Sequence, residues 1–298
     1  MPRPSPSPVG PRRVPLRERL PLHWLGLVPF LTFVTLFLIL PTLYIVVGAF
    51  RAQGGGFTLD NITGLNTASI RSAYWVSIKI SLASASLGCL VGFCMAAAMT
   101  LGDLPKFVRG PLLTFSGVAS NFAGVPLAFA FLATLGPIGL VTVFLRTNLG
   151  IDLRAMGFNI LSFWGLTITY LFFQIPLMIL IITPALDGLK REWREAAAIL
   201  GATGPQYWRM VAFPILFPSI LGTMALLFAN SFGAVATAIA LTGSSLNIVP
   251  ILLFAQIRGD VLGNPYLGYA LAFGMIIVTG IANTIYIVLR ARSERWQK

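Results

Sequence analysis

The amino-acid sequence predicts an all-α membrane protein that crosses the bilayer six times. Of its 298 residues, 56% are hydrophobic and only 10% are charged, whereas soluble domains carry about 25% charged residues. Six charge-free runs each exceed the ~20 residues that a helix needs to cross the hydrocarbon layer. The runs are Leu25–Ala49, Ile80–Leu101, Pro111–Leu135, Leu161–Thr183, Phe213–Leu241 and Tyr266–Leu289. A soluble globular domain is thereby excluded.

The charges lie at the ends of these runs and predict the orientation. With six spans and a cytoplasmic amino terminus, 15 of the 21 Lys and Arg residues fall on the inner side. Cytoplasmic loops of membrane proteins are enriched in these residues, so both termini are expected in the cytoplasm. Residues 1–21 read as a disordered basic tail, residues 22–292 as one membrane domain, and residues 293–298 as a second tail. A nucleic-acid-binding patch is disfavoured because no compact charged domain exists to present one.

Two apolar segments between the predicted spans are too short to cross the bilayer. Ile248–Ile257 follows the interruption at Thr242–Ser245, and Leu140–Leu145 follows the break at Gly136–Gly139. A crossing by the first would also move the basic carboxyl tail to the outer side. We therefore expect both as short re-entrant or surface helices on the outer side.

The second span carries small residues at every fourth position: Ser84, Gly88, Gly92 and Ala96. This spacing puts them on one helix face, where a second helix can approach closely. The alternative is that glycine and alanine are simply common in membrane helices. The pattern predicts a packing face without identifying the helix that meets it.

Residues that carry out bond-changing chemistry are scarce. Cys89 and Cys94 both lie in the second span, and His23 is the only histidine. No cluster has the spacing of a metal site or of a nucleophile with its base. The four lysines, Lys79, Lys106, Lys190 and Lys298, do not follow a G-x-x-x-x-G pattern, so the chain has no nucleotide-binding P-loop. We expect neither an enzyme nor a cofactor in this chain.

Polar residues inside the apolar runs are candidates for lining a path across the membrane, because they are costly in lipid. They are Asn121, Tyr170, Gln174, Asn230 and Ser231. Each can equally form a hydrogen bond between helices. A transporter or channel driven by an ion gradient is the alternative function, but coupling to protons or sodium usually uses an acidic residue or histidine within the membrane, and the runs contain neither.

The segment between the fourth and fifth spans, residues 184–212, predicts two helices outside the bilayer. Apolar residues fall at helical spacing up to Leu200, with charged residues around them. Gly201 is suited to ending the first helix, and Gly204-Pro205 to opening the second. From these residues alone, an amphipathic helix that only anchors the loop to the membrane surface remains an alternative.

Within this loop a 20-residue pattern resembles a known family. Glu195-Ala196-Ala197, three residues, Gly201, nine residues and Val211-x-Phe213-Pro214 resemble the EAA signature of permease subunits of binding-protein-dependent ABC importers. The chain departs from that signature in having Val211 for isoleucine and Phe213 for leucine. The end of the first span, the Ser77–Leu82 segment and the Leu186–Leu189 run are most similar to the spermidine/putrescine group of these permeases.

The resemblance implies a type I (MetI-like) six-helix permease of the bacterial inner membrane, with a polyamine-like or related organic solute. Residues 184–212, which we call the coupling loop, would dock in a groove of a cytoplasmic ATPase through Trp193, Glu195, Ala196, Ala197 and Gly201, together with Pro214 just after the loop. The implied partners are two ATPase subunits that bind ATP and Mg²⁺, an extracytoplasmic solute-binding protein and a second, related permease. The small-residue face and the polar residues need a facing surface, which also favours a pair of permeases.

Overall fold

The computed structural model describes residues 26–52, 54–102, 106–259 and 266–294. The predicted amino-terminal tail, 1–21, and residues 295–298 of the carboxyl-terminal tail lie outside the described residues. The described chain is helical apart from turns, loops and an isolated bridge between Arg51 and Phe57. In order, the elements are α1 Val28–Val34, the π-helical η3 Thr35–Ile39, α2 Leu40–Ala49, α3 Asp60–Thr63, α4 Ala68–Leu101, α5 Lys106–Asn121, α6 Val125–Leu135, α7 Leu140–Asn148, α8 Phe163–Asp187, α9 Arg191–Ile199, α10 Gly204–Tyr207, the π-helical η4 Trp208–Ala212, α11 Phe213–Phe232, α12 Val235–Thr242, α13 Val249–Ile257 and α14 Leu267–Glu294.

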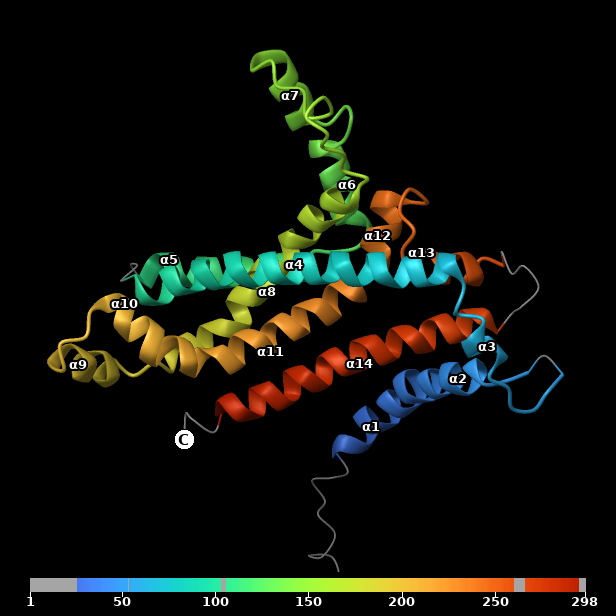
Figure 1. Ribbon diagram of the computed structural model, residues 1–298, viewed down its shortest axis with the longest axis horizontal. Coiled ribbons are helices and arrows are strands. Elements are labelled where there is room, and N and C mark those ends of the chain that lie inside the picture. Colours follow the sequence, from blue (N-terminus) through green and yellow to red (C-terminus); the bar gives the residue numbers. More distant parts are fainter. Residues whose placement is uncertain (1–25, 53, 103–105, 260–265, 295–298) are drawn as a thin grey trace, which may run out of the picture.

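The body of the molecule is a bundle of α4, α8, α11 and α14, with α2 on the outside of α14. The helices α9 and α10 lie at one end of this bundle, and α3 lies at the opposite end (Figure 1). The core between α4, α8 and α11 consists of apolar side chains such as Met178, Ile182 and Leu227, each fully buried. The coupling loop is therefore held at one end of the long bundle axis.

The described residues contain six helical segments long and apolar enough to cross a membrane. They are Val28–Ala49, Ala68–Leu101, Val125–Asn148, Phe163–Asp187, Gly204–Phe232 and Leu267–Arg292. The predicted number of spans is thus confirmed, and each predicted run overlaps one of these segments. The short segment Ile248–Ile257 is helical as α13, whereas the predicted outer helix at Leu140–Leu145 belongs to α7, which lies within the candidate span Val125–Asn148.

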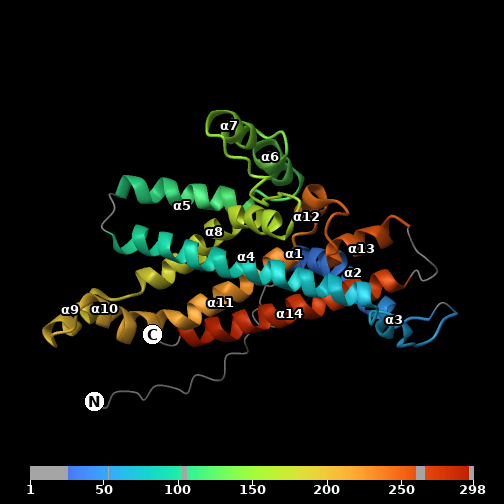
Figure 2. The same ribbon diagram turned by 45° about the horizontal axis from the view of Figure 1, so that its top comes forward.

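Two predicted spans are wrong in extent, because each is broken in the structure. The run predicted as Pro111–Leu135 divides into α5 and α6 at Gly124, whose φ is +76°. The run predicted as Phe213–Leu241 ends at Phe232, after which α12 begins at Val235. The two breaks meet: the Gly124 N–H donates to the Thr237 Oγ1 at 2.7 Å. Beyond the first break, α6 and α7 form an arm that projects from the side of the bundle (Figures 1 and 2).

The small-residue face of α4 packs against α8. A Cβ added at Gly88 would lie 2.8 Å from the Gln174 Cβ, and one added at Gly92 would lie 2.6 Å from the Met178 Cβ. Ser84 and Ala96 on the same face are fully buried. The predicted packing face is confirmed, but its partner belongs to the same chain. The expectation that this face needs a second permease was therefore wrong.

Candidate functional site

The coupling loop is shaped by the way its first helix ends. The Ala202 N–H donates to the Ala197 carbonyl at 2.9 Å and the Gly201 N–H to the Ala198 carbonyl at 3.0 Å. This Schellman arrangement requires a residue with positive φ between helix and turn. Gly201 has a φ of +77°, so the glycine predicted to end α9 adopts the backbone conformation that favours glycine.

The second half of the coupling loop leads back into the bundle. The Thr203 N–H donates to the Gln206 Oε1 at 2.7 Å, which fixes the start of α10. The helix continues directly from α10 into the wider π-helical turn η4 and then into α11. Here the Trp208 ring packs edge-to-face against Phe93 of α4, with 6.5 Å between ring centroids. The turn between α9 and α10 is thus connected to the bundle through an aromatic contact.

The surface of the coupling loop is open over the whole of α9, which contains no buried residue. The Glu195 side chain is 60% exposed and accepts a hydrogen bond from the Arg191 Nε at 3.0 Å, within the same helix. Ala196 and Pro214 are exposed, whereas Trp193 and Ala197 are half-buried. The predicted coupling residues therefore present one carboxylate and several small or apolar groups to the surroundings.

Two strongly exposed apolar residues of this surface are not among the predicted coupling residues, although Leu200 was recognised as part of the apolar helix face. Ile199 and Leu200 are each 87% exposed, directly before the Gly201 turn. Large apolar side chains this exposed are typical of a surface that another molecule covers. The sequence signal that could have identified Ile199 and Leu200 was their position at the end of a largely polar helix, within the EAA spacing.

A second feature, the central hollow, lies where the two helix breaks meet. It has a volume of about 480 Å³ and is partly open to the surroundings. The hollow is lined by Ser120, Asn121, Ala123, Gly124, Phe173, Asn230, Gly233, Ala234, Val235, Ala236 and Thr237. None of these residues carries a charge. Its walls combine two exposed amide side chains, Asn121 and Asn230, with the backbone of the two breaks.

The five polar residues predicted to line a path fall into two groups. Asn121 and Asn230 line the central hollow. The other three are buried and join elements of this chain. The Gln174 Nε2 donates to the Leu227 carbonyl at 2.9 Å, and the Tyr170 Oη to the Ala234 carbonyl at 3.1 Å. The Ser231 Oγ donates to the Ser81 carbonyl at 3.4 Å. These three side chains connect α8, α11 and α4 behind the hollow.

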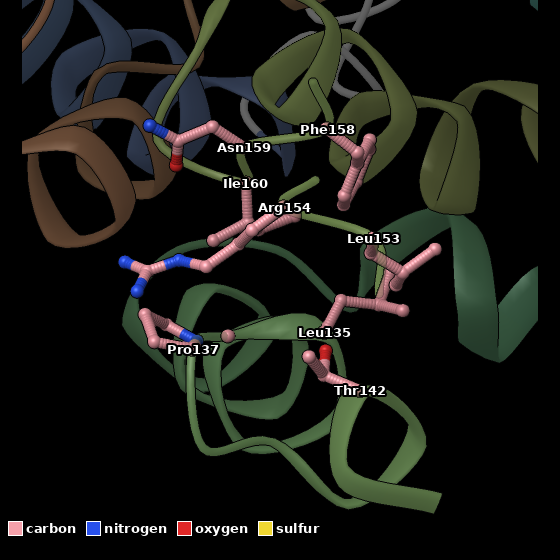
Figure 3. A pocket seen from close by; sticks show the side chains of 9 residues that line it. Leu135, Pro137, Thr142, Leu153, Arg154, Phe158, Asn159 and Ile160 are labelled. Atoms are coloured by element: carbon pink, nitrogen blue, oxygen red, sulfur yellow. The ribbon is translucent and has the colours of Figure 1, made fainter. Parts of the chain in front are cut away.

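The arm contains a much smaller cavity, seen in Figure 3 between Leu135, Thr142 and Arg154. Its volume is about 10 Å³, which corresponds to one water molecule. The Thr142 Oγ1 is buried at this cavity without a hydrogen-bond partner in the described protein. A water molecule there would satisfy the hydroxyl, whereas a solute is excluded by size.

Comparison with known proteins relates part of the chain to a known family. Residues 155–298 match the family described as binding-protein-dependent transport system inner membrane component. That stretch runs from just before α8 through the coupling loop to the end of the chain. It contains the whole EAA pattern, so the match agrees with the resemblance to permease subunits of ABC importers.

Individual relatives agree with this match. The chain is 23% identical over 237 residues to the spermidine/putrescine transport system permease protein PotC of Escherichia coli (strain K12), covering 77% of this chain and 81% of that protein. It is 27% identical to the sulfate transport system permease protein CysT of Synechococcus elongatus, covering 82% and 86% of the two chains. A solved bacterial ABC transporter for alginate import matches with a TM-score of 0.67 at 16% identity, over 94% of this chain and 98% of that chain. The predicted all-α fold of this importer type is confirmed, while the relatives differ in solute.

Proposed function

We propose that this chain is a permease that forms, together with a second permease, the membrane path for a small hydrophilic solute that an extracytoplasmic binding protein delivers. Closure of two ATPase subunits would be transmitted through the coupling loop. The observation that carries this proposal is the exposed α9 helix ending at Gly201, in the EAA spacing and at one end of the bundle. Exposed Ile199 and Leu200 supply an apolar contact, and Glu195 supplies a carboxylate for a basic partner group.

The energy source is proposed to lie outside this chain. The sequence has no P-loop lysine, so ATP and Mg²⁺ would be bound by the ATPase subunits. Because that ATP is cytoplasmic, the end of the bundle with the coupling loop is assigned to the cytoplasm. The segments predicted to face the cytoplasm carry the excess of Lys and Arg, which supports this orientation. Both termini would then lie on the cytoplasmic side of a bacterial inner membrane.

The central hollow is proposed as this chain's share of the path. It is partly open to the surroundings, and a second permease over the open part would complete its wall. The Asn230 amide offers both hydrogen-bond donors and acceptors, and the Asn121 amide offers its Oδ1, since its Nδ2 donates to the Gly117 carbonyl at 2.9 Å. Such groups suit solutes with several polar groups. Polyamines remain one candidate class and sulfate-like anions another, since relatives of both descriptions match the chain.

The proposed function is tested by the composition and activity of the purified complex. Native mass analysis is expected to give two permease chains per two ATPase subunits, and reconstituted vesicles should take up solute only with ATP and the binding protein. Uptake driven by a proton or sodium gradient without ATP would instead support the alternative of a secondary transporter. A complex with a single permease chain would contradict the paired path.

The role of the hollow is tested by the Asn230→Leu variant. Loss of one hydrogen-bonding amide from the path is expected to lower the uptake rate about 2- to 10-fold, with unchanged yield of the complex. The matched control is Asn148→Leu, which makes the same change on exposed α7, outside the hollow. Equal uptake by both variants would remove Asn230 from the path.

A further inference from the structure

One ion pair connects parts of the bundle that are far apart in the sequence. The Arg109 Nη2 lies 2.5 Å from the Asp187 Oδ2. Arg109 lies in the first turn of α5, and Asp187 is the last residue of α8, inside the coupling loop and directly before its exposed helix. The other ion pair of the described residues, Arg191 with Glu195, is local to α9. The Arg109–Asp187 pair thus joins the root of the coupling loop to α5.

The far end of α5 reaches the central hollow. The helix has 16 residues, which corresponds to about 24 Å, and it packs along α8. Its last two residues, Ser120 and Asn121, line the hollow. The helix α5 therefore contacts the start of the coupling loop at one end and lines the central hollow at the other.

A break in the backbone after Asn121 divides α5 from α6. Gly124 precedes α6 with a φ of +76°, and its N–H donates to the Thr237 Oγ1 of α12. The α6 side of the break is thus held mainly by α12, with a ring contact from Phe131 to Phe172 of α8, whereas α5 packs along α8 and pairs with Asp187. A displacement of the coupling loop would shift Asn121 relative to Gly124 and change the shape of the hollow.

We propose that Arg109 and Asp187 are positioning residues that fasten α5 to the coupling loop, so that movement of the ATPases reaches the solute path. The inference rests on the proposed function and adds the route of transmission to it. Ion pairs that are about one third or more exposed contribute little to stability, and these side chains are 35% and 44% exposed. Breaking the pair is therefore expected to spare the fold and to impair coupling.

The test compares Arg109→Gln, Asp187→Asn and the charge-exchanged double variant Arg109→Asp/Asp187→Arg in reconstituted complexes. Each single variant is expected to bind the ATPases normally and to move about two- to fivefold less solute per ATP hydrolysed. The charge exchange should restore the ratio toward that of the unaltered permease. The control is Arg292→Gln, which removes a cation from the exposed last turn of α14. An unchanged ratio in the single variants, or a double variant no better than either, would overturn the proposal.

A second measurement does not depend on uptake. A thiol probe is placed by Asn121→Cys, with the exposed Cys94 replaced by serine. ATP is expected to change the labelling rate at position 121, and Arg109→Gln should abolish that change. Failure of the proposed function would appear as a complex without ATP-driven uptake in the unaltered permease. Failure of this inference would appear as ATP-dependent labelling that persists in Arg109→Gln, or as its absence with the ion pair intact.

Discussion

The Gly92→Val variant is expected to lose the stable packing of α4 on α8. A Cβ at this position would lie 2.6 Å from the Met178 Cβ and 2.9 Å from the Ile175 carbonyl oxygen. Because the second contact is with backbone, rotation of a side chain cannot relieve it, and the two helices must separate. Overpacking of this kind typically costs about 1–3 kcal/mol, and occasionally more. We expect a strong fall in purified yield and in the Tm of the detergent-solubilised permease.

The control for Gly92→Val is Gly280→Val in α14. Both changes put a β-branched residue into a long helix, but a Cβ at Gly280 meets nothing within 4 Å. The control therefore carries the cost of the lower helix propensity without the clash. If the two variants melted at the same temperature, the α4–α8 contact would not be the one that the structure describes.

The Gly201→Val variant is expected to abolish coupling while the permease still inserts into the membrane. A Cβ at this glycine would meet nothing within 4 Å, so the effect comes only from its φ of +77°. A β-branched residue in this region costs about 1–3 kcal/mol, and relief of that strain would turn α9 away from the EAA geometry. ATPase co-purification and binding-protein-stimulated ATP hydrolysis are the measurements.

Two companion variants separate coupling from simple anchoring of the loop. Gly201→Asn should retain most activity, because asparagine tolerates positive φ. Glu195→Ala should weaken ATPase association by about 2–5 kcal/mol if its carboxylate becomes buried and paired in the interface. A loop that only lies on the membrane surface would tolerate Glu195→Ala, and unaltered ATPase binding by both Gly201→Val and Glu195→Ala would contradict the coupling assignment.

The sequence by itself determined the features that depend on short-range order. Six apolar segments follow from composition, because crossing hydrocarbon requires about 20 apolar residues in a row. The end of α9 at Gly201 follows from local backbone preference, since glycine is the residue that best adopts positive φ after a helix. The spacing from Glu195 to Pro214 likewise depends only on residues close in the sequence, and it carries the resemblance to the family that matches residues 155–298.

The tertiary structure decided which residues meet. A charge-free run cannot reveal the break at Gly124, because that break is held by Thr237, more than a hundred residues away. The face of small residues on α4 predicted close packing, but only the fold showed that α8 covers it. Asn230 and Ser231 are adjacent and similarly polar, yet one lines the hollow and the other is buried. Successive residues of a helix point about 100° apart, so the packing of α11 against its neighbours determines their surroundings.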